Sequence, residues 1–538
     1  MKPLTNPSRR LFLAGSTAFA GIAGLSGRAW SQDMFPVVDT ANGKLRGVWT
    51  SGVATFKGVH YAASTAGLNR FMPPQPVEKW AGVKDALTMS EVAPQVPGGR
   101  TSGYGDLIVF DRQPSGIGED CLSVNIWTPS LEQNARKPVI MVIHGGGYYG
   151  GSGNSFGMDG DAMTRFSDCV VVAVNHRLGA MGFANLEDFG GSDFASSGTV
   201  GMQDLVAALA WIQENIAAFG GDPDRVLVYG QSGGGAKTSN LLAMPSAKGL
   251  MHRAGVMSGS SLALQSKDDA ARTADAYLRV LGLNKGEVHK LRQLPLTTLI
   301  AAQAGMEADM RARGEAPRTF GPCVDGLAIP HQTWTPDAPE ESADVPMVIS
   351  TALDERTYRM RNFDMTDAEL LEFARERAGE QAEEAVALYK EDDPDARPFH
   401  LAARMDTDTG FRRSAFTMAE RKAAQGGAPV WTYLWTWPSP AYEGRYGAVH
   451  GIDVGLALHS VRGGLTGASA ESVAMADRLA GTWAAFAATG NPNNEYVPDW
   501  PEYTQSDRAT MIFDNEMKVV EDPRADIRDF WEGVDADG

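Results

Sequence analysis

The chain has 538 residues, of which 43% are hydrophobic and 21% are charged, so it can bury a large core and is neither disordered nor fibrous. Its 48 lysines and arginines and 66 acidic residues give a net charge of −18, which argues against nucleic acid or anionic lipid as a partner. Three widely spaced cysteines, Cys121, Cys169 and Cys323, fit neither a disulfide framework nor a zinc site, and we expect each to be a small buried side chain.

Residues 1–31 resemble a twin-arginine signal peptide. The pair Arg9-Arg10 is followed by two large apolar residues, a moderately apolar segment, and small residues at a cleavage site. The alternative is a membrane-anchoring or amphipathic helix, which is disfavoured because an apolar run of about 17 residues is marginal for a bilayer span. We therefore expect the twin-arginine (Tat) machinery to export a periplasmic or secreted protein that keeps no stable membrane anchor. The remaining residues, 32–538, are expected to form one domain.

Short runs of β-branched or aromatic residues alternate with longer segments along the rest of the chain. One of the longer segments, residues 202–218, has the apolar periodicity of a helix. Strands separated by long connections indicate a mainly parallel sheet with helices on both faces, so the predicted fold class is α/β. The predicted strands are residues 139–143, 170–174, 226–229, 345–349 and 431–437.

Two further stretches, residues 267–310 and 366–392, are mostly helical by pattern. The second opens with Thr366 and Glu369 in capping-box spacing, and Gly379 is placed to end its first helix. A second helix is predicted from about residue 381. We expect these blocks to form a cap over the strand ends rather than separate domains.

Ser232 is the candidate nucleophile. It lies in the pattern Gly230-Gln231-Ser232-Gly233-Gly234, between the predicted strand 226–229 and a helix-compatible stretch. Such a nucleophile elbow is a tight turn that leaves no room for bulky side chains next to the serine. A second match around Ser155 has neither a strand before it nor an apolar helix after it, and we interpret it as a loop.

A serine hydroxyl needs a base, and the oxyanion of its tetrahedral intermediate needs hydrogen-bond donors. The glycines from Gly145 to Gly147 follow His144 at the end of the strand 139–143. The alternatives are a flexible loop or a phosphate cradle, but no Lys-Ser/Thr pair follows as in a Walker loop. We predict that the backbone N–H groups of Gly146, Gly147 and Gly233 form an oxyanion hole.

These two glycine motifs belong to a longer series that spans nearly the whole mature chain. The chain resembles the type-B carboxylesterases, the α/β-hydrolase branch that includes cholinesterases and para-nitrobenzyl esterases. This resemblance implies an α/β-hydrolase fold with a helical cap and a serine hydrolase that cleaves small-molecule carboxylic esters through an acyl-enzyme, without metal or cofactor. The other matching segments are residues 56–62, 119–126, 175–179, 219–223, 320–326, 354–355, 448–451 and 490–493.

The resemblance assigns the remaining catalytic roles to Glu355 as the acid and His450 as the base, in the chain order Ser232, Glu355, His450 that is typical of α/β-hydrolases. Ser258 resembles a serine that hydrogen-bonds near the triad and supports it. The residues matching a conserved ion pair of the family, Arg177 and Asp204, are expected to be structural.

Four residues depart from the family pattern. Gln231 stands where the family usually has Glu, which removes a negative charge beside the triad and should weaken any preference for cationic alcohols. Gly233 replaces the usual Ala, and Cys121 matches a loop cysteine that has no upstream partner here. Arg356 replaces the glycine that usually follows the acid, and an ion pair of Arg356 next to Glu355 is expected.

Two other functions are compatible with this fold. The same triad can cleave amides, so an amidase or peptidase is one alternative. The second is an adhesion or binding protein that has lost catalysis, but such proteins lack a complete triad and often carry a membrane anchor. Tyr148 and Tyr149, together with the aromatic segment 431–437, suggest a partly apolar substrate pocket.

Overall fold

The computed structural model describes residues 34–96, 104, 107 and 115–537. The predicted signal peptide, residues 1–31, lies outside the described residues. Within them, no helix combines the length and the apolar character needed to cross a bilayer.

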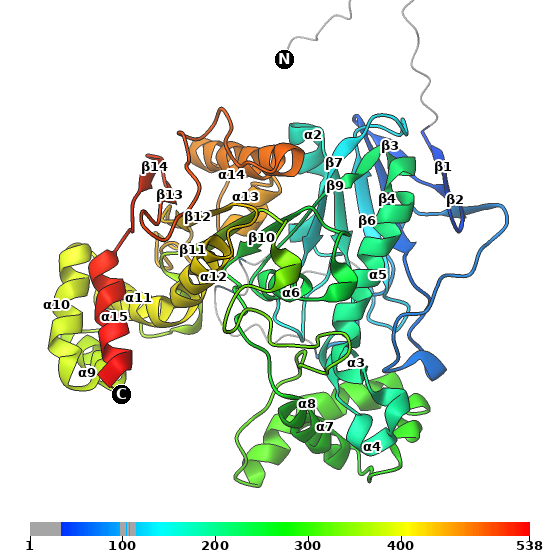
Figure 1. The fold of residues 1–538 in the computed structure, drawn as a ribbon, viewed down its shortest axis with the longest axis horizontal. Helices are drawn as coiled ribbons and strands as arrows, with labels where there is room; N and C mark the ends of the chain where they lie inside the picture. The colour runs from blue at the N-terminus through cyan, green and yellow to red at the C-terminus, as the bar shows by residue number, and fades with distance from the viewer. Residues whose placement is uncertain (1–33, 97–103, 105–106, 108–114, 538) are drawn as a thin grey trace, which may run out of the picture.

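The described chain forms an 11-stranded sheet and a separate three-stranded sheet (Figure 1). The small sheet contains β1 (Val37–Thr40), β2 (Gly43–Arg46) and β5 (Val83–Asp85), and the large sheet contains β3 (Val48–Thr50), β4 (Val53–His60), β6 (Ser123–Thr128), β7 (Lys137–Ile143), β8 (Val170–Val174), β9 (Gly221–Gln231), β10 (Arg253–Met257), β11 (Met347–Ala352), β12 (Val430–Trp435), β13 (Thr510–Phe513) and β14 (Lys518–Val520).

The order of the large sheet is β14-β13-β12-β11-β10-β9-β7-β8-β6-β4-β3. Every pair between β13 and β8 is parallel, whereas the pairs at the two ends are antiparallel. The prediction of a mainly parallel sheet is therefore confirmed for the part that carries the candidate site.

The sheet is covered on both faces, which explains why its central strands are continuous apolar runs. Along β7, Met141 belongs to one core cluster and its neighbour Val142 to the other, because successive side chains point to opposite faces. The first cluster includes Leu205 and Leu209 of α5 (Val200–Asn215), and the second includes Leu479 and Trp483 of α14 (Ala470–Thr489). The two helices thus lie on opposite faces of the sheet, as expected for an α/β protein.

Two groups of helices lie away from the centre of the sheet, and each contains one of the two predicted helical blocks. In Figure 1, α7 (Lys267–Val280) and α8 (Leu296–Ala312) lie together at the bottom, and α9 (Asp367–Ala378), α10 (Ala382–Asp392), α11 (Pro398–Thr407) and α15 (Ala525–Asp537) lie at the left. The predicted capping box forms, since the Thr366 hydroxyl accepts from Glu369 N–H and the Glu369 carboxylate accepts from Thr366 N–H. The remaining α-helices of the described residues are α2 (Asp161–Ser167), α3 (Gly179–Phe183), α4 (Glu187–Gly190), α6 (Gly233–Leu241), α12 (Arg413–Ala424) and α13 (Asp453–Ala457).

The aromatic segment 431–437 lies in the core and does not line a substrate pocket as expected. It forms β12, which ends at Trp435, and Trp431, Trp435 and Trp437 are all buried. The Trp435 ring stacks on Phe513 of β13, with centroids 5.7 Å apart. These side chains belong to the core because β12 lies inside the sheet, between β11 and β13.

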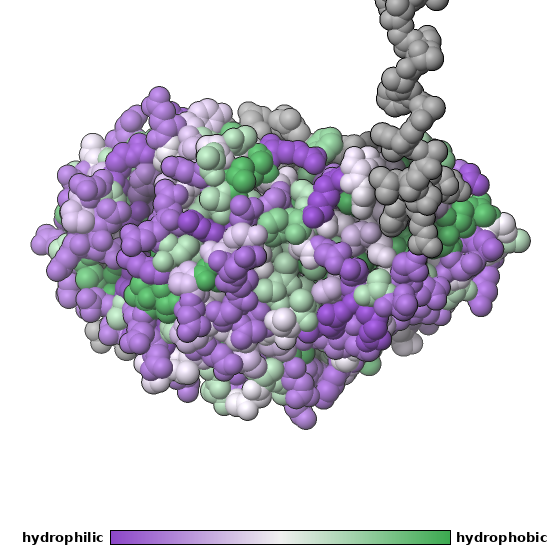
Figure 2. Space-filling view, turned by 90° about the horizontal axis from the view of Figure 1, so that it is seen from above, coloured by the Kyte–Doolittle hydropathy of each residue, from purple (hydrophilic) through white to green (hydrophobic). Residues whose placement is uncertain are grey.

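The second serine motif, around Ser155, lies in a loop, as predicted, but a short 3₁₀ turn follows the serine. The seven-residue helix α2 begins only at Asp161. Cys121, Cys169 and Cys323 are buried and unpaired, as predicted. The face drawn in Figure 2 is largely hydrophilic with small scattered apolar areas, which agrees with the acidic composition.

Candidate active site

Ser232 occupies a strained turn between β9 and α6. Its backbone has φ 59° and ψ −123°, an unfavourable conformation for a residue with a side chain. A Cβ atom on Gly230 would lie 2.5 Å from the backbone of Gly234, so the turn closes only with glycine at this position. This is the geometry of a nucleophile elbow, and it presents Ser232 at the amino terminus of α6.

The glycine loop after β7 lies directly against this turn. Gly146 and Gly147 have φ values of 87° and 60°, which favour glycine. A Cβ on Gly233 would lie 2.4 Å from both N and O of Gly147, so loop and helix touch backbone to backbone. The N–H groups of Gly146, Gly147 and Gly233 donate to no other described residue and are available to a ligand oxygen.

Glu355 and His450 form a buried pair at the carboxyl end of the sheet. Glu355 Oε2 lies 2.5 Å from His450 Nδ1, and Oε1 accepts a hydrogen bond from Ala352 N–H at 2.8 Å. The carboxylate is fully buried and the imidazole is 5% exposed. Glu355 therefore orients the ring and leaves Nε2 for another partner.

Asp354 joins the turn that carries Glu355 to the loop that carries His450. Its backbone N–H donates to Ala448 O at 3.0 Å, and its Oδ2 accepts from Ala448 N–H at 2.8 Å. Its Oδ1 pairs with Arg404 of α11 at 2.8 Å. Three segments distant in sequence are thereby fixed around the pair.

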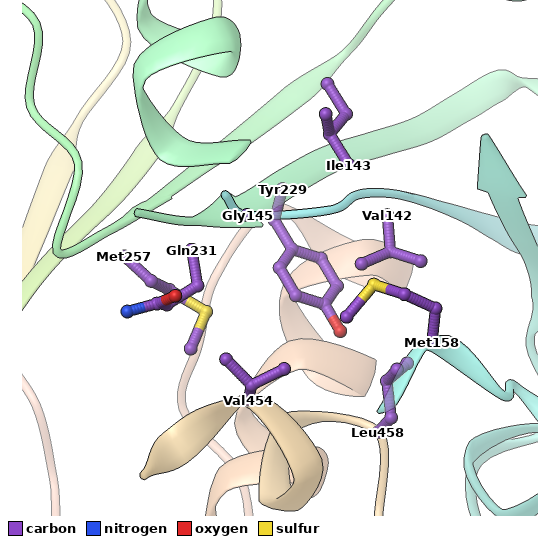
Figure 3. Close-up of a pocket in the computed structure, with 9 residues that line it drawn as sticks. All are labelled: Val142, Ile143, Gly145, Met158, Tyr229, Gln231, Met257, Val454 and Leu458. Carbon is purple, nitrogen blue, oxygen red and sulfur yellow. The ribbon is translucent and has the colours of Figure 1, made fainter. Parts of the chain in front are cut away.

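The His450 ring is enclosed by three side chains. Gln231 Nε2 lies 3.2 Å from ring Nε2, Tyr358 stacks on the ring with centroids 5.1 Å apart, and Phe411 packs at 5.1 Å with a tilt of 46°. Phe411 comes from a π-helix, Asp408–Arg412, a local geometry that is frequent at functional sites. Figure 3 shows Gln231 beside Met257 and above Val454, at the edge of a small apolar cavity under β9.

Two expectations about supporting residues are not met. The Ser258 hydroxyl is buried but makes no hydrogen bond with the described residues, since its backbone turns at φ 47° while its N–H pairs with Ser350 O. Arg356 forms no ion pair with any described residue. Its guanidinium instead lies 4.8 Å from the Phe411 ring centroid, because the short helix Glu355–Arg359 points it toward the π-helix. The Ser232 hydroxyl also makes no hydrogen bond within the described chain.

Asp453 is a second buried carboxyl group at the site, and none of the sequence motifs described above includes it. Burial, followed by the charge of Glu355, raises the pKa of Asp453 to about 7. Its Oδ2 accepts from the Tyr433 hydroxyl at 3.2 Å, while Oδ1 has no partner among the described residues. The sequence feature that could have predicted its place near the site is its position three residues after His450, at the start of α13.

Other polar residues of the matching motifs have structural contacts. Arg177 and Asp204 form a fully buried ion pair at 2.6 Å, as expected. His144 stacks on His176 with centroids 5.0 Å apart, and burial lowers the pKa of both imidazoles. The described chain contains no group of three or more His, Cys, Asp or Glu side chains suited to a metal ion.

Comparisons with known proteins over nearly the whole chain show its family. The model of the carboxylesterase family matches residues 34–531. The para-nitrobenzyl esterase of Bacillus subtilis is 34% identical over 505 residues, covering 91% of this chain and 97% of the relative. Phenmedipham hydrolase of Pseudarthrobacter oxydans is 31% identical over 501 residues, and the match covers 90% of this chain and 96% of the relative.

Solved structures give the same result. An esterase from Clostridium hathewayi that can hydrolyse aliphatic aromatic polyesters superposes with a TM-score of 0.81 at 33% identity, covering 93% of this chain and 99% of that one. A carboxylesterase of Geobacillus stearothermophilus has a TM-score of 0.77 at 32% identity, with coverages of 92% and 99%. The chain therefore belongs to the carboxylesterase family, with the α/β-hydrolase fold, and is a serine hydrolase that cleaves carboxylic esters.

Proposed function

We propose that Ser232, His450 and Glu355 are the nucleophile, base and acid of this hydrolase. Ser232 Oγ attacks the ester carbonyl carbon while His450 Nε2 takes the hydroxyl proton, and Glu355 holds the ring in the required tautomer and stabilises its cation. The observation that supports these roles most strongly is the buried pair of Glu355 and His450, at 2.5 Å, beside the strained turn at Ser232. Catalytic hydrogen bonds often tighten only when substrate is bound, so the unbonded Ser232 hydroxyl is compatible with this assignment.

The tetrahedral oxyanion accepts from the N–H groups of Gly146, Gly147 and Gly233 in this mechanism. His450 then gives its proton to the leaving alcohol, and the acyl group stays on Ser232. In the second half, His450 removes a proton from water, the resulting hydroxide attacks the acyl carbon, and the proton returns to Ser232. The products are an alcohol and a carboxylic acid.

The substrates proposed here are uncharged esters with aromatic or alkyl groups. Tyr358 and Phe411 give the site aromatic walls next to His450, and the exposed side chain of Tyr149 follows the glycine loop. Gln231 provides no carboxylate to attract a cationic alcohol. The names of the relatives, para-nitrobenzyl esterase and an esterase for aliphatic aromatic polyesters, agree with this class.

Export through the Tat machinery to the periplasm or beyond is a separate part of the proposal, supported by the segment around Arg9-Arg10. Replacing both arginines by lysine should leave the protein in the cytoplasm. Cell fractionation with an activity assay tests this, and unchanged export would contradict it.

The catalytic assignment is tested by stopped-flow hydrolysis of a short-chain para-nitrophenyl ester. Wild type should turn over, whereas Ser232→Ala should lose about 10⁶ in kcat. Ser155→Ala is the matched control, since Ser155 lies in the other glycine-serine-glycine motif, and it should retain wild-type turnover. A fully active Ser232→Ala enzyme would overturn the assignment, and faster cleavage of a matched anilide than of the ester would favour an amidase.

A further inference from the structure

Lys237 carries a buried amine that the proposed mechanism does not use. It lies one turn into α6, five residues after Ser232, and is fully buried. Among the described residues it has no carboxylate partner, and its only hydrogen bond runs from Nζ to His144 O at 3.2 Å. Burial lowers the pKa of this amine to about 7. A buried amine with one hydrogen bond is costly, so its presence beside the nucleophile calls for a role.

The atom that Lys237 contacts is the start of the glycine loop. His144 follows the last residue of β7, and its carbonyl lies two residues before Gly146, the first of the loop residues at positive φ, Gly146 and Gly147. Such glycines have wide conformational freedom, so the direction of their N–H groups must be fixed from outside.

Asn240, one turn further along α6, holds the other end of the same loop. Its Nδ2 donates to the Tyr148 hydroxyl at 2.7 Å, and Lys237 Nζ lies 6.0 Å from the centre of the Tyr148 ring. Tyr148 follows Gly147 directly and packs edge-on against Phe183, with centroids 5.3 Å apart. Lys237 and Asn240 therefore brace the loop on both sides of Gly146 and Gly147.

We infer that Lys237 is a positioning residue for the oxyanion hole: through its hydrogen bond to His144 O it fixes the glycine loop on α6, so that Gly146, Gly147 and Gly233 direct their N–H groups at one oxygen. The inference rests on the oxyanion hole proposed above. Because those N–H groups bind the transition state more strongly than the substrate, loss of the brace should reduce kcat and leave KM nearly unchanged.

Lys237→Met is the direct test, since methionine has a similar length and needs no hydrogen bond. With a para-nitrophenyl ester, kcat should fall about tenfold to a hundredfold, less than or equal to the loss of a whole oxyanion donor. The affinity for phenyl trifluoromethyl ketone, whose hemiketal oxygen occupies the hole, should fall by the same factor. The thermal midpoint should be equal to or above that of wild type, because a buried amine has been removed.

Lys422 provides a matched control. It is also fully buried, burial lowers the pKa of its amine to about 8, and Nζ donates to Ser342 O at 2.6 Å and Ala343 O at 3.0 Å. It lies on α12, away from the glycine loop, so Lys422→Met should keep kcat and ketone affinity within about twofold of wild type.

Asn240→Leu removes the hydrogen bond to the Tyr148 hydroxyl and tests the inference even if Lys237→Met does not fold. The kcat of Asn240→Leu should fall about threefold to tenfold, with little change in KM. Wild-type kcat and ketone affinity in Lys237→Met, or wild-type kcat in Asn240→Leu, would overturn the inference while leaving the proposed function intact. A folded wild-type enzyme with neither turnover nor ketone binding would overturn both.

Discussion

The side-chain amide of Gln231 lies on the face of the His450 imidazole, with its Nε2 3.3 Å from ring Nδ1 and 3.2 Å from ring Nε2. One atom can approach both ring nitrogens this closely only from above the ring plane, because the carbon between them blocks the approach within the plane. The residue before the nucleophile thus contacts the base directly, and a neutral amide stands where the family usually has a carboxylate.

Gln231→Glu should therefore change the pH dependence of the enzyme. A carboxylate on the ring face would stabilise the imidazolium, so the acid limb of kcat/KM should move to higher pH by about one unit. Hydrolysis of an acetyl ester of choline should improve relative to its uncharged carbon analogue. Gln231→Met is the control for packing alone and should show neither change. An unmoved acid limb in Gln231→Glu would contradict this account of the contact.

Asp453 should make stability depend on pH between its two pKa values. Burial and Glu355 raise its pKa from 3.8 to about 7 in the folded protein. The unfolded chain then releases this proton first, so stability is lost as pH rises from about 4 toward 7. Asp453→Asn removes this loss of stability, so the thermal midpoint of the variant relative to that of wild type should increase as pH rises across this range. The exposed Asp193→Asn should track wild type, and a constant offset for Asp453→Asn would contradict the prediction.

Gly233→Ala should impair catalysis in this chain, although alanine favours helices and is the usual residue of the family at this position. The added Cβ would lie 2.4 Å from N and O of Gly147 and would push the glycine loop away from α6. We expect kcat to fall by about 10² with a small change in KM. Gly533→Ala in α15, where a Cβ meets no atom within 4 Å, should be fully active and about 0.5 kcal/mol more stable. Wild-type kcat in Gly233→Ala would show that the loop adapts freely.

Local patterns predicted the elements and the turn at Ser232 well, because the signals involved are local. The apolar runs of β7, β8 and β9, the capping box at Thr366 and the glycines around Ser232 each act within a few residues. Element ends were less accurate: β11 begins at Met347 and ends at Ala352, beyond the predicted end at residue 349. The last residues of a strand depend on partner strands that periodicity does not reveal.

The surroundings of His450 could not be predicted in the same way. Tyr358 and Phe411 reach the ring from a 3₁₀ turn and a π-helix that lie far from it in sequence. The sequence predicts an ion pair of Arg356 next to Glu355, yet the Arg356 guanidinium packs on the Phe411 ring. The direction of a side chain in a short turn depends on which other segments pack against that turn. The aromatic side chains of β12 are buried in the core because β12 lies between β11 and β13 in the sheet. This strand order cannot be predicted from the local sequence.

The most direct measurement of the central claim is the site of covalent labelling by a fluorophosphonate in the purified mature protein, located by peptide mass spectrometry after hydrolysis of a para-nitrophenyl ester has been measured. This account predicts one adduct, on Ser232, formed in step with loss of esterase activity and absent from Ser232→Ala. An adduct on Ser155, or full labelling of Ser232→Ala with retained turnover, would contradict it.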